Sequence, residues 1–490
     1  MKQQYPFMKK QFTAAVAATG CFCALHTAAQ AQVTLSPAER QAIINQLKQE
    51  MRDSAARKST VISEDVTVTK TDTAQAAEPF AFGDFTWVQG SNRQKKALLD
   101  TKYFTGGTTI DCNYNYSFAR PIDHTNSGST ATFRANEFNI SYIETGGEFH
   151  DPKTGAHAKL FLQFGTRATG IPRNDNTPLR GQFDLYTALR FVTEGYAGIH
   201  LNKLHGINID FGIFKSYVGL LSYNNFENWN YQPSYTSDNT PWFFTGSRVQ
   251  IFPSDKLKVE LWLVNGWQTY GMFNESPGVG FQLQWRPKES VSILGSSYYG
   301  HDTALNPNRY RFHTDNSAVI RYFNAPGRRG ISKAAFSITG DLGFEGGDGQ
   351  VTGFGGTAAK PAQNFLSAMF YNRFWYGKNQ HFATTFGGGV ISNPGRYLAL
   401  LPTGTGILTQ NPGDEFKGWD ASANVQYMPN DYLTFGFEYV TRHASQPYFT
   451  GHGGVTSPNG WNPPIGDPTG FVADLVKDEN RLIFSTIFRF

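Results

Sequence analysis

The chain of 490 residues is poor in cysteine and in charge, and it has no long apolar run. Its three cysteines cannot build a disulfide framework. Charged residues make up 17% of the chain, against about 25% in an ordinary soluble domain. A helical membrane protein would need runs of about 18 or more apolar residues, which are missing. The chain instead carries 50 glycines and 15% aromatic residues, a composition that argues against intrinsic disorder.

Residues 1–31 have the pattern of a secretory signal peptide. Lys9 and Lys10 precede an Ala-rich apolar stretch, and Ala29-Gln30-Ala31 supplies the small residues of a cleavage site. We expect cleavage near Ala31; the weaker alternative is a lipoprotein anchored at Cys21. Cleavage would remove three lysines and no acidic residue, which leaves 40 basic against 39 acidic residues. This near-neutral balance argues against a nucleic-acid partner.

Residues 32–79 are expected to form a short periplasmic helix followed by a flexible linker. Ser36-Pro37-Ala38-Glu39 has the capping-box pattern with proline at the first helical position, and the helix would run to about Arg57. Ile44, Leu47 and Met51 follow the spacing of a narrow apolar seam, but two heptads are too few to identify a coiled coil. A plain helix and an oligomerising helix both remain open.

Residues 80–490 change to an apolar period of two. Apolar and polar residues alternate strictly in several segments, for example Ile110–Phe118, Leu257–Leu263 and Leu433–Tyr439. Such alternation predicts strands with one apolar and one polar face. Short and long connections also alternate along the chain, as periplasmic turns and outer loops do. We predict an all-β fold, a transmembrane antiparallel up-and-down β-barrel, with a soluble β-sandwich or β-helix as the rival.

Counting back from Phe490, the pattern predicts 16 strands that begin near Gly107. Phe80–Gly90 would be a seventeenth strand, which conflicts with having both ends of the barrel on the periplasmic side. Either this segment stays out of the wall, in the lumen or at the mouth, or Ala97–Phe104 adds an eighteenth strand. We favour 16. The terminal Phe490 resembles the signal by which the barrel-assembly machinery of Gram-negative bacteria recognises outer-membrane barrels.

Five short segments together resemble the β-barrel porin-2 (OmpL-like) outer-membrane family. They are GDFTW at 83–87, DHTNSGS at 123–129, LHGINIDFGIF at 204–214, NWNYQPSY at 228–235 and NPGRY at 393–397. The resemblance covers residues 80–490 and implies a bacterial outer-membrane barrel with pore activity. It supplies no catalytic or binding residues to transfer, and it does not extend to the helix at Ser36–Arg57.

A set of polar side chains is placed on the lumen face by the alternation. Charge and shape inside the lumen set the selectivity of a porin. Five members are basic and five acidic, so we expect weak charge selectivity rather than a phosphate-type basic ring. The alternative for each of these charged residues is that it forms an ion pair on the wall and has no part in ion selectivity. The pore-lining candidates are Asp111, Asn113, Asn115, Lys159, Arg167, Asp210, Arg248, Lys258, Glu260, Asp420, Glu438 and Arg442.

The predicted loop from Ser216 to Asn239 is the candidate constriction, because rings and amides crowd within it. Rings stack on sugar faces, and amides form hydrogen bonds with hydroxyl groups. The alternative is a loop that packs on itself and covers the barrel rim. The crowded positions are Tyr223, Asn224, Asn225, Phe226, Asn228, Trp229, Asn230 and Tyr231.

The sequence therefore predicts a porin for passive diffusion of small hydrophilic solutes, and not an enzyme. Its expected partners are outer-membrane lipid, the assembly machinery and the solutes, and a homotrimer is left open. The first alternative is a plugged structural or adhesion barrel, which would conduct nothing.

The second alternative is an outer-membrane hydrolase, which would need a serine, a histidine and an acid within hydrogen-bond reach. Asp123, His124 and Ser127 lie close in sequence, as do His443 and Ser445, but no nucleophile-elbow, phosphate-loop or zinc-helix motif accompanies them. We expect no cofactor. His150, Asp151 and His157 are compatible with a metal, although a solvated turn explains them better, so we expect no metal site.

Overall fold

The computed structural model describes residues 45, 78–88, 94, 97–172, 175, 184–272, 274–303, 306–348, 352–357, 360–395, 415–456 and 471–490. The predicted signal peptide lies outside these residues. So do the predicted helix and linker, apart from residues 45, 78 and 79. Contacts divide the chain into units 1–74 and 75–490, and the fold described below is that of the second unit.

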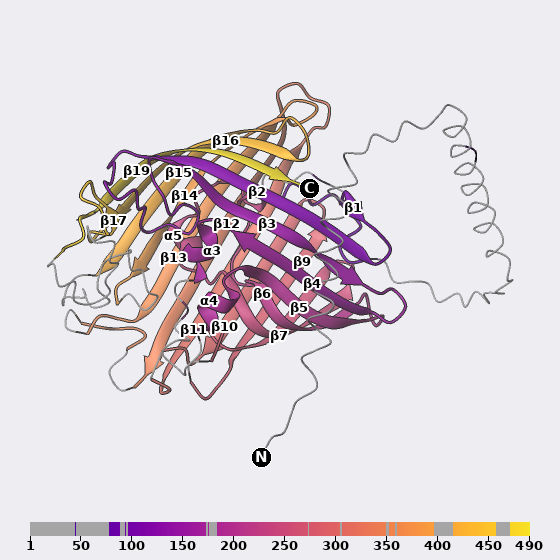
Figure 1. Cartoon of the computed structure of the whole chain (residues 1–490), viewed down its shortest axis with the longest axis horizontal. Helices are drawn as coiled ribbons and strands as arrows, with labels where there is room; N and C mark the ends of the chain where they lie inside the picture. Colours follow the sequence, from indigo (N-terminus) through magenta and orange to yellow (C-terminus); the bar gives the residue numbers. More distant parts are fainter. Residues whose placement is uncertain are drawn as a thin grey trace, which may run out of the picture. The chain divides into compact units, whose positions relative to one another are not determined.

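Sixteen antiparallel strands close into a barrel, as predicted (Figure 1). Each strand pairs with its neighbour along the chain, and the last strand pairs with the first, with Phe484 opposite Tyr114. A two-residue strand, β1 (Leu99–Asp100), lies beside β2 and is not an eighteenth spanning strand. The barrel strands are β2 (Phe104–Ser117), β3 (Phe138–His150), β4 (Ala156–Phe164), β5 (Val192–Leu201), β6 (Ile207–Lys215), β7 (Phe243–Ser254), β8 (Leu257–Val264), β9 (Gly278–Lys288), β10 (Val291–Gly300), β11 (Arg309–Asn324), β12 (Ile331–Gly347), β13 (Asn364–Tyr376), β14 (Phe382–Asn393), β15 (Phe416–Tyr427), β16 (Leu433–Ala444) and β19 (Asp478–Arg489).

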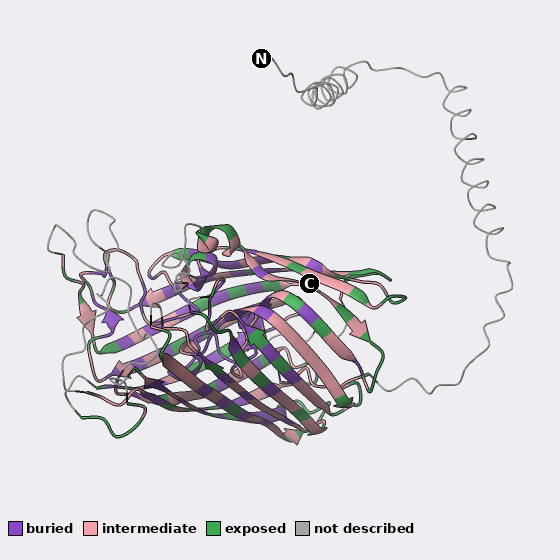
Figure 2. Cartoon of the chain, turned by 90° about the horizontal axis from the view of Figure 1, so that it is seen from below, coloured by how far each residue is buried: buried purple, intermediate pink, exposed green. Residues whose placement is uncertain are grey.

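The two faces of the wall differ as the period of two requires. On β6 the side chains of Ile209 and Phe211 are 43% and 73% exposed, whereas Asp210 between them is 1% exposed. Figure 2 shows this alternation as bands of exposed and buried residues along the strands. Apolar residues therefore cover the outer face, where lipid would surround them, and polar residues point inward.

Short turns join the strands at one end of the barrel, and longer loops join them at the other. The turn between β9 and β10 spans only residues 289–290, whereas the loop between β6 and β7 spans residues 216–242. The longer loops carry the short helices α3 (Arg167–Gly170), α4 (Leu185–Leu189), η3 (Asn225–Glu227) and α5 (Tyr235–Asp238), and the hairpin of β17 (Phe449–Thr450) and β18 (Leu475–Val476). Within the described ranges, no helix has the length and apolarity to cross a membrane.

The segment Phe80–Val88 lies against the inner side of the short-turn end and is not a strand. The Phe80 amide donates to the carbonyl oxygen of Asp255 at 2.7 Å, and the Trp87 indole donates to that of Glu289 at 3.1 Å. Both acceptors belong to short turns. Of the two options predicted for Phe80–Gly90, exclusion from the wall is the correct one for its described part.

Candidate functional site: the barrel lumen

The loop between β6 and β7 folds inward and is anchored on the opposite wall. The Tyr231 hydroxyl donates to Asp111 Oδ1 at 2.8 Å, and Asn225 Nδ2 donates to Asp111 Oδ2 at 2.9 Å. The backbone amide of Tyr231 donates to Glu438 at 2.6 Å. Asp111 lies on β2 and Glu438 on β16, so the loop crosses the lumen. We refer to residues 216–242 as the inward loop.

A second anchor holds the end of the inward loop at α5. The Ser234 hydroxyl donates to Asp420 Oδ2 at 2.7 Å, and the Tyr235 amide donates to the same oxygen at 3.0 Å. Arg442 donates to Asp238 Oδ2 at 3.0 Å, and its guanidinium lies 4.2 Å from the centre of the Tyr235 ring. Burial raises the pKa of Asp238, and the charge of Arg442 opposes that shift. Asp420 and Arg442 thus hold the loop in the lumen.

Arg167 reaches the interior by a route that the strand pattern did not predict. Its placement on a strand face was wrong, because β4 ends at Phe164 and Arg167 begins α3. The side chain is 1% exposed. Its Nη1 donates to Asn225 Oδ1 at 2.9 Å, and its guanidinium lies 4.7 Å from the centre of the Tyr223 ring. Arg167 therefore packs against the inward loop from α3, which follows the end of β4.

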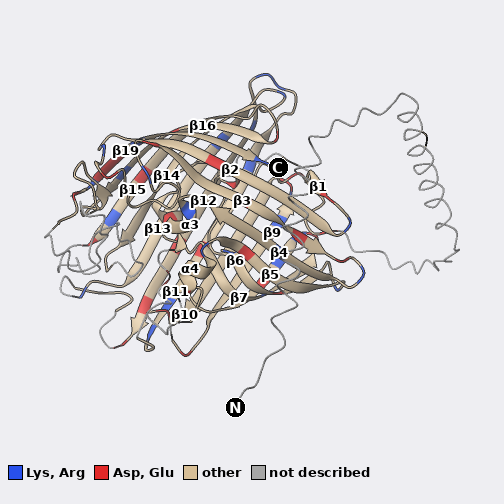
Figure 3. Ribbon diagram, viewed as in Figure 1, with Lys and Arg blue, Asp and Glu red and all other residues tan. Residues whose placement is uncertain are grey.

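The remaining charged candidates on β6, β7 and β8 form ion pairs along the wall. Arg248 Nη2 lies 2.6 Å from Asp210 Oδ2, and His157 Nε2 lies 2.5 Å from Asp210 Oδ1. Lys258 Nζ lies 2.7 Å from Glu260 Oε1. Figure 3 shows such charged residues as isolated bands on strands that are otherwise uncharged. These contacts match the alternative of wall-lining pairs.

The two amide candidates on β2 also engage protein groups. Asn113 Nδ2 donates to the Tyr231 hydroxyl at 2.9 Å, and Asn115 Nδ2 donates to the carbonyl oxygen of Arg134 at 2.9 Å. Arg134 belongs to the loop between β2 and β3, which also folds against the inner wall. Loops therefore cover the polar face of β2 at Asn113 and Asn115.

A cavity of about 520 Å³ remains on the side of β2 to β6. We call it the β2–β6 cavity. The wall and the inward loop both contribute to it, the latter through Ser222, Asn224, Phe226 and Glu227. Of the twelve pore-lining candidates only Lys159 lines it. The other charged lining residues are Glu144, Glu148, Glu194, Lys215, Glu227 and Arg489.

Sequence reasoning missed these six charged residues. Glu144 and Glu148 are separated by four positions on one strand, so the period of two was sufficient to place both on the lumen face. Glu227 had no such signal because it belongs to the inward loop, whose course depends on its anchors.

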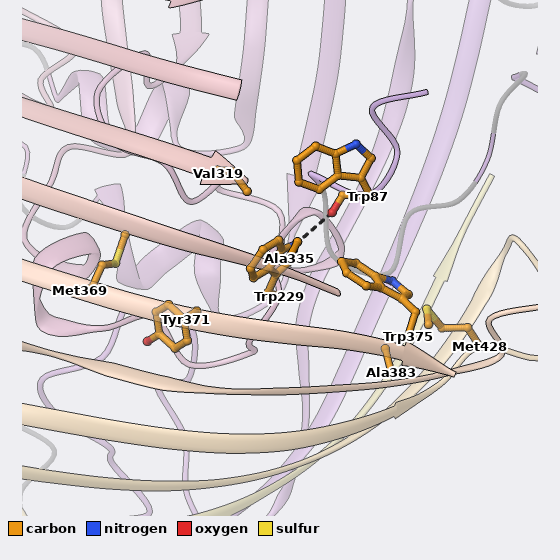
Figure 4. Close-up of a cluster of buried hydrophobic side chains, with 9 residues drawn as sticks. All are labelled: Trp87, Trp229, Val319, Ala335, Met369, Tyr371, Trp375, Ala383 and Met428. Atoms are coloured by element: carbon orange, nitrogen blue, oxygen red, sulfur yellow. Dashed lines mark hydrogen bonds between the residues drawn. The ribbon is translucent and has the colours of Figure 1, made fainter. Parts of the chain in front are cut away.

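The opposite side of the lumen, along β11 to β14, is filled. Trp87 and Trp229 meet there in a buried cluster with Val319, Ala335, Met369, Tyr371, Trp375, Ala383 and Met428 (Figure 4). Trp229 Nε1 donates to the backbone oxygen of Trp87 at 3.3 Å, and the rings of Trp229 and Trp375 meet edge to face. A smaller cavity, of about 180 Å³, lies beside this cluster. The segment Phe80–Val88 and the inward loop together close this half.

The candidate catalytic residues form hydrogen bonds with other groups and not with one another. Ser127 donates to the carbonyl oxygen of Tyr448 at 3.3 Å, and His124 Nδ1 lies 2.9 Å from that of Ala135. Ser445 donates to the carbonyl oxygen of Glu415, and His443 contacts Asp478 on β19. Neither pair forms the serine–histidine contact that a triad requires. Within the described residues, no group of three or more histidine, cysteine or acidic side chains has a geometry that could hold a metal.

The family model described as "Putative beta-barrel porin-2, OmpL-like" matches residues 103–490. The chain belongs to this family. It is therefore a porin, and an outer-membrane β-barrel, of the OmpL-like family. The segment Phe80–Val88 precedes the range that the family model matches. No curated protein matches this OmpL-like chain.

Several solved outer-membrane proteins are similar in structure. In-vitro folded OmpT of Vibrio cholerae in its trimer form is 8% identical, with a TM-score of 0.46, over 80% of this chain and 100% of that one. The outer membrane channel DcaP of Acinetobacter baumannii is 9% identical, with a TM-score of 0.45, over 79% and 97%. OprB of Pseudomonas putida is 11% identical, with a TM-score of 0.47, over 79% and 94%.

Proposed function

We propose that this porin is a passive diffusion channel whose aqueous path follows the wall of β2 to β6. The observation that carries the proposal is the asymmetry of the lumen. The β2–β6 cavity leaves about 520 Å³ on this side, whereas the cluster around Trp87 and Trp229 fills the other. Barrels of 16 strands are wide enough for an aqueous channel, and in this proposal the inward elements reduce its width without closing it.

The inward loop is the proposed constriction. Its anchors on Asp111, Glu438 and Asp420 hold it across the lumen, where Asn224 and Phe226 border the β2–β6 cavity. Solutes that pass this point would meet an amide and an aromatic ring. Small hydrophilic solutes fit this lining, and weak charge selectivity follows from acidic and basic groups that nearly balance.

We propose that the protein is not an enzyme. The side chains of Ser127 and His124 are bonded to backbone groups of other residues. A hydrolase would instead aim the hydroxyl at the imidazole. Passage of solutes through the lumen needs no covalent step and no cofactor.

A plugged structural barrel is the second candidate function, favoured by the buried Trp87–Trp229 cluster. If the β2–β6 cavity closes in the membrane, the barrel would conduct nothing. Liposome swelling with sugars of increasing size separates the two functions. A diffusion channel predicts swelling that falls as the sugar grows. A swelling rate equal to that of protein-free liposomes would reject the channel and favour the plugged barrel.

For targeting, we propose a signal peptide of residues 1–31 that is cleaved near Ala31. The C-terminal strand β19 would carry the assembly signal, with Phe490 at its end, and the barrel would assemble as a homotrimer. Mass spectrometry of the protein from outer membranes tests the cleavage, with a mature chain beginning at residue 32 as the expected result. Crosslinking in native membranes tests the trimer, and removal of Phe490 should slow assembly into heat-stable barrels.

A further inference from the structure

The lysines of the β2–β6 cavity are neutralised by two of its glutamates. Lys215 Nζ lies 2.7 Å from Glu144 Oε1 and 3.5 Å from Glu194 Oε2. Lys159 Nζ lies 3.0 Å from Glu194 Oε2. The side chains of Glu144 and Glu194 are only 6% and 12% exposed. The four groups therefore form a compact ionic cluster on β3 to β6, with little net charge to offer a passing ion.

Three charged groups of the cavity remain outside the ion pairs of this cluster, although the charge of Glu227 acts on both Lys215 and Arg489. Glu148 lies on β3, and Glu227 lies on η3 of the inward loop, where it accepts a hydrogen bond from Ser222. Arg489 on β19 packs its guanidinium 4.5 Å from the centre of the Phe226 ring. Among the described residues, no ion pair within 4.0 Å joins any of these three to a charged partner. The charged side chains that line the cavity are thus four glutamates against three cationic groups.

We propose that the β2–β6 cavity makes the channel prefer cations, with Glu148 and Glu227 as the groups that attract them. The inference rests on the proposed diffusion path. Charged groups in a cleft with low-dielectric walls focus their field and concentrate ions of the opposite sign. The solutes that benefit are small cations, both inorganic ions and protonated amines. Glu148 is supplied by the wall and Glu227 by the loop, so a cation meets a carboxylate on each side of the path.

The sequence predicted five basic and five acidic residues on the lumen face, but this balance does not give the net charge along the proposed path through the β2–β6 cavity. Asp111, Glu438 and Asp420 have their oxygens bonded to the inward loop, and Arg248 is paired with Asp210. The three carboxylates keep their charges, but an arginine opposes each of them: Arg167 for Asp111, Arg442 for Asp420 and Arg481 for Glu438. None of these groups lines the cavity. The sign of the weak selectivity is therefore set by the residues that line the cavity.

The test is the reversal potential of the full-length barrel in a planar bilayer under a KCl gradient. We expect potassium to be more permeant than chloride in the wild type. The double variant Glu148→Gln, Glu227→Gln should lose this preference or become anion-selective, and Arg489→Gln should strengthen it. The matched control is Glu415→Gln, since Glu415 lies in an outer loop and contacts Lys417 rather than the cavity. Its reversal potential should equal that of the wild type.

Two results would overturn the inference. One is a chloride preference in the wild type. The other is a double variant that still conducts and keeps the wild-type reversal potential, because Glu148 and Glu227 would then have no part in selection. Both leave the diffusion channel itself intact. A bilayer without conductance steps would instead reject the proposed path, and the cation preference with it.

Discussion

The indole Nε1 of Trp229 donates a hydrogen bond to the backbone oxygen of Trp87 at 3.3 Å. This contact joins the inward loop to a segment that precedes the family-matched range. Arg321 strengthens the junction, because its guanidinium lies 5.4 Å from the centre of the Trp87 ring and donates to Glu289 at 2.7 Å. The two inward elements therefore support each other in the filled half of the lumen.

Replacing Trp87 by Ala should raise the single-channel conductance. Trp87 is 1% exposed, and removing such a ring from a packed site costs roughly 3–5 kcal/mol of local packing free energy. The segment Phe80–Val88 would loosen and the filled half would admit water. Trp285→Ala is the matched control, since Trp285 is 45% exposed on the outer face. Equal conductance in both variants and the wild type would show that the segment does not restrict the lumen.

Deleting Tyr223–Tyr231 should also raise the conductance. These residues carry Trp229, the Tyr231 anchor and the part of the inward loop that borders the β2–β6 cavity. Their removal widens the proposed constriction, while the strands β6 and β7 keep their pairing. Planar-bilayer recording measures the change. An unchanged conductance would reject the constriction.

Tyr231→Phe should destabilise the barrel by about 1–3 kcal/mol, because it leaves a buried charged acceptor with fewer donors. The lost hydroxyl donates to Asp111 Oδ1 and accepts from Asn113. Denaturant unfolding of the refolded barrel measures the free energy of unfolding. In a double-mutant cycle, Tyr231→Phe should cost much less when Asp111→Asn is already present. Additive costs would mean that the two residues do not interact.

A lysine on the outer face should destabilise the barrel by an amount that depends on depth. Phe211 lies near the middle of β6 and is 73% exposed, so Phe211→Lys should cost about 2–4 kcal/mol in a bilayer. Phe138 begins β3 at the end of the barrel, and Phe138→Lys should cost only about 0–1 kcal/mol. Reversible denaturant unfolding and refolding in liposomes measures the free energy of unfolding of both variants. Equal costs would contradict a membrane-spanning wall.

The barrel was predictable from the sequence because lipid and lumen impose opposite demands on alternate residues. Ile110 and Cys112 alternate with Asp111 and Asn113, and the structure places the latter two inside. The period of two also favoured the observed count of 16 strands, but the even number alone left 18 open, with both Phe80–Gly90 and Ala97–Phe104 in the wall. The alternation of apolar and polar residues therefore indicates which side chains face lipid and which face the lumen.

What fills the lumen was not predictable in the same way. Alternation places Asp420 and Glu438 on the inner face, but it does not reveal that the inward loop bonds to them. That course depends on contacts between residues about 200 positions apart, as between Tyr231 and Glu438. Arg167 was misplaced for a related reason, because a strand pattern was extended beyond the end of β4.

Single-channel recording of the purified full-length barrel in a planar bilayer tests the central claim most directly. The claim is that an aqueous path along β2 to β6 stays open beside the filled half of the lumen. We predict discrete conductance steps in the wild type, which become larger when Tyr223–Tyr231 is deleted. A correctly folded barrel with no steps above the protein-free background would contradict the account.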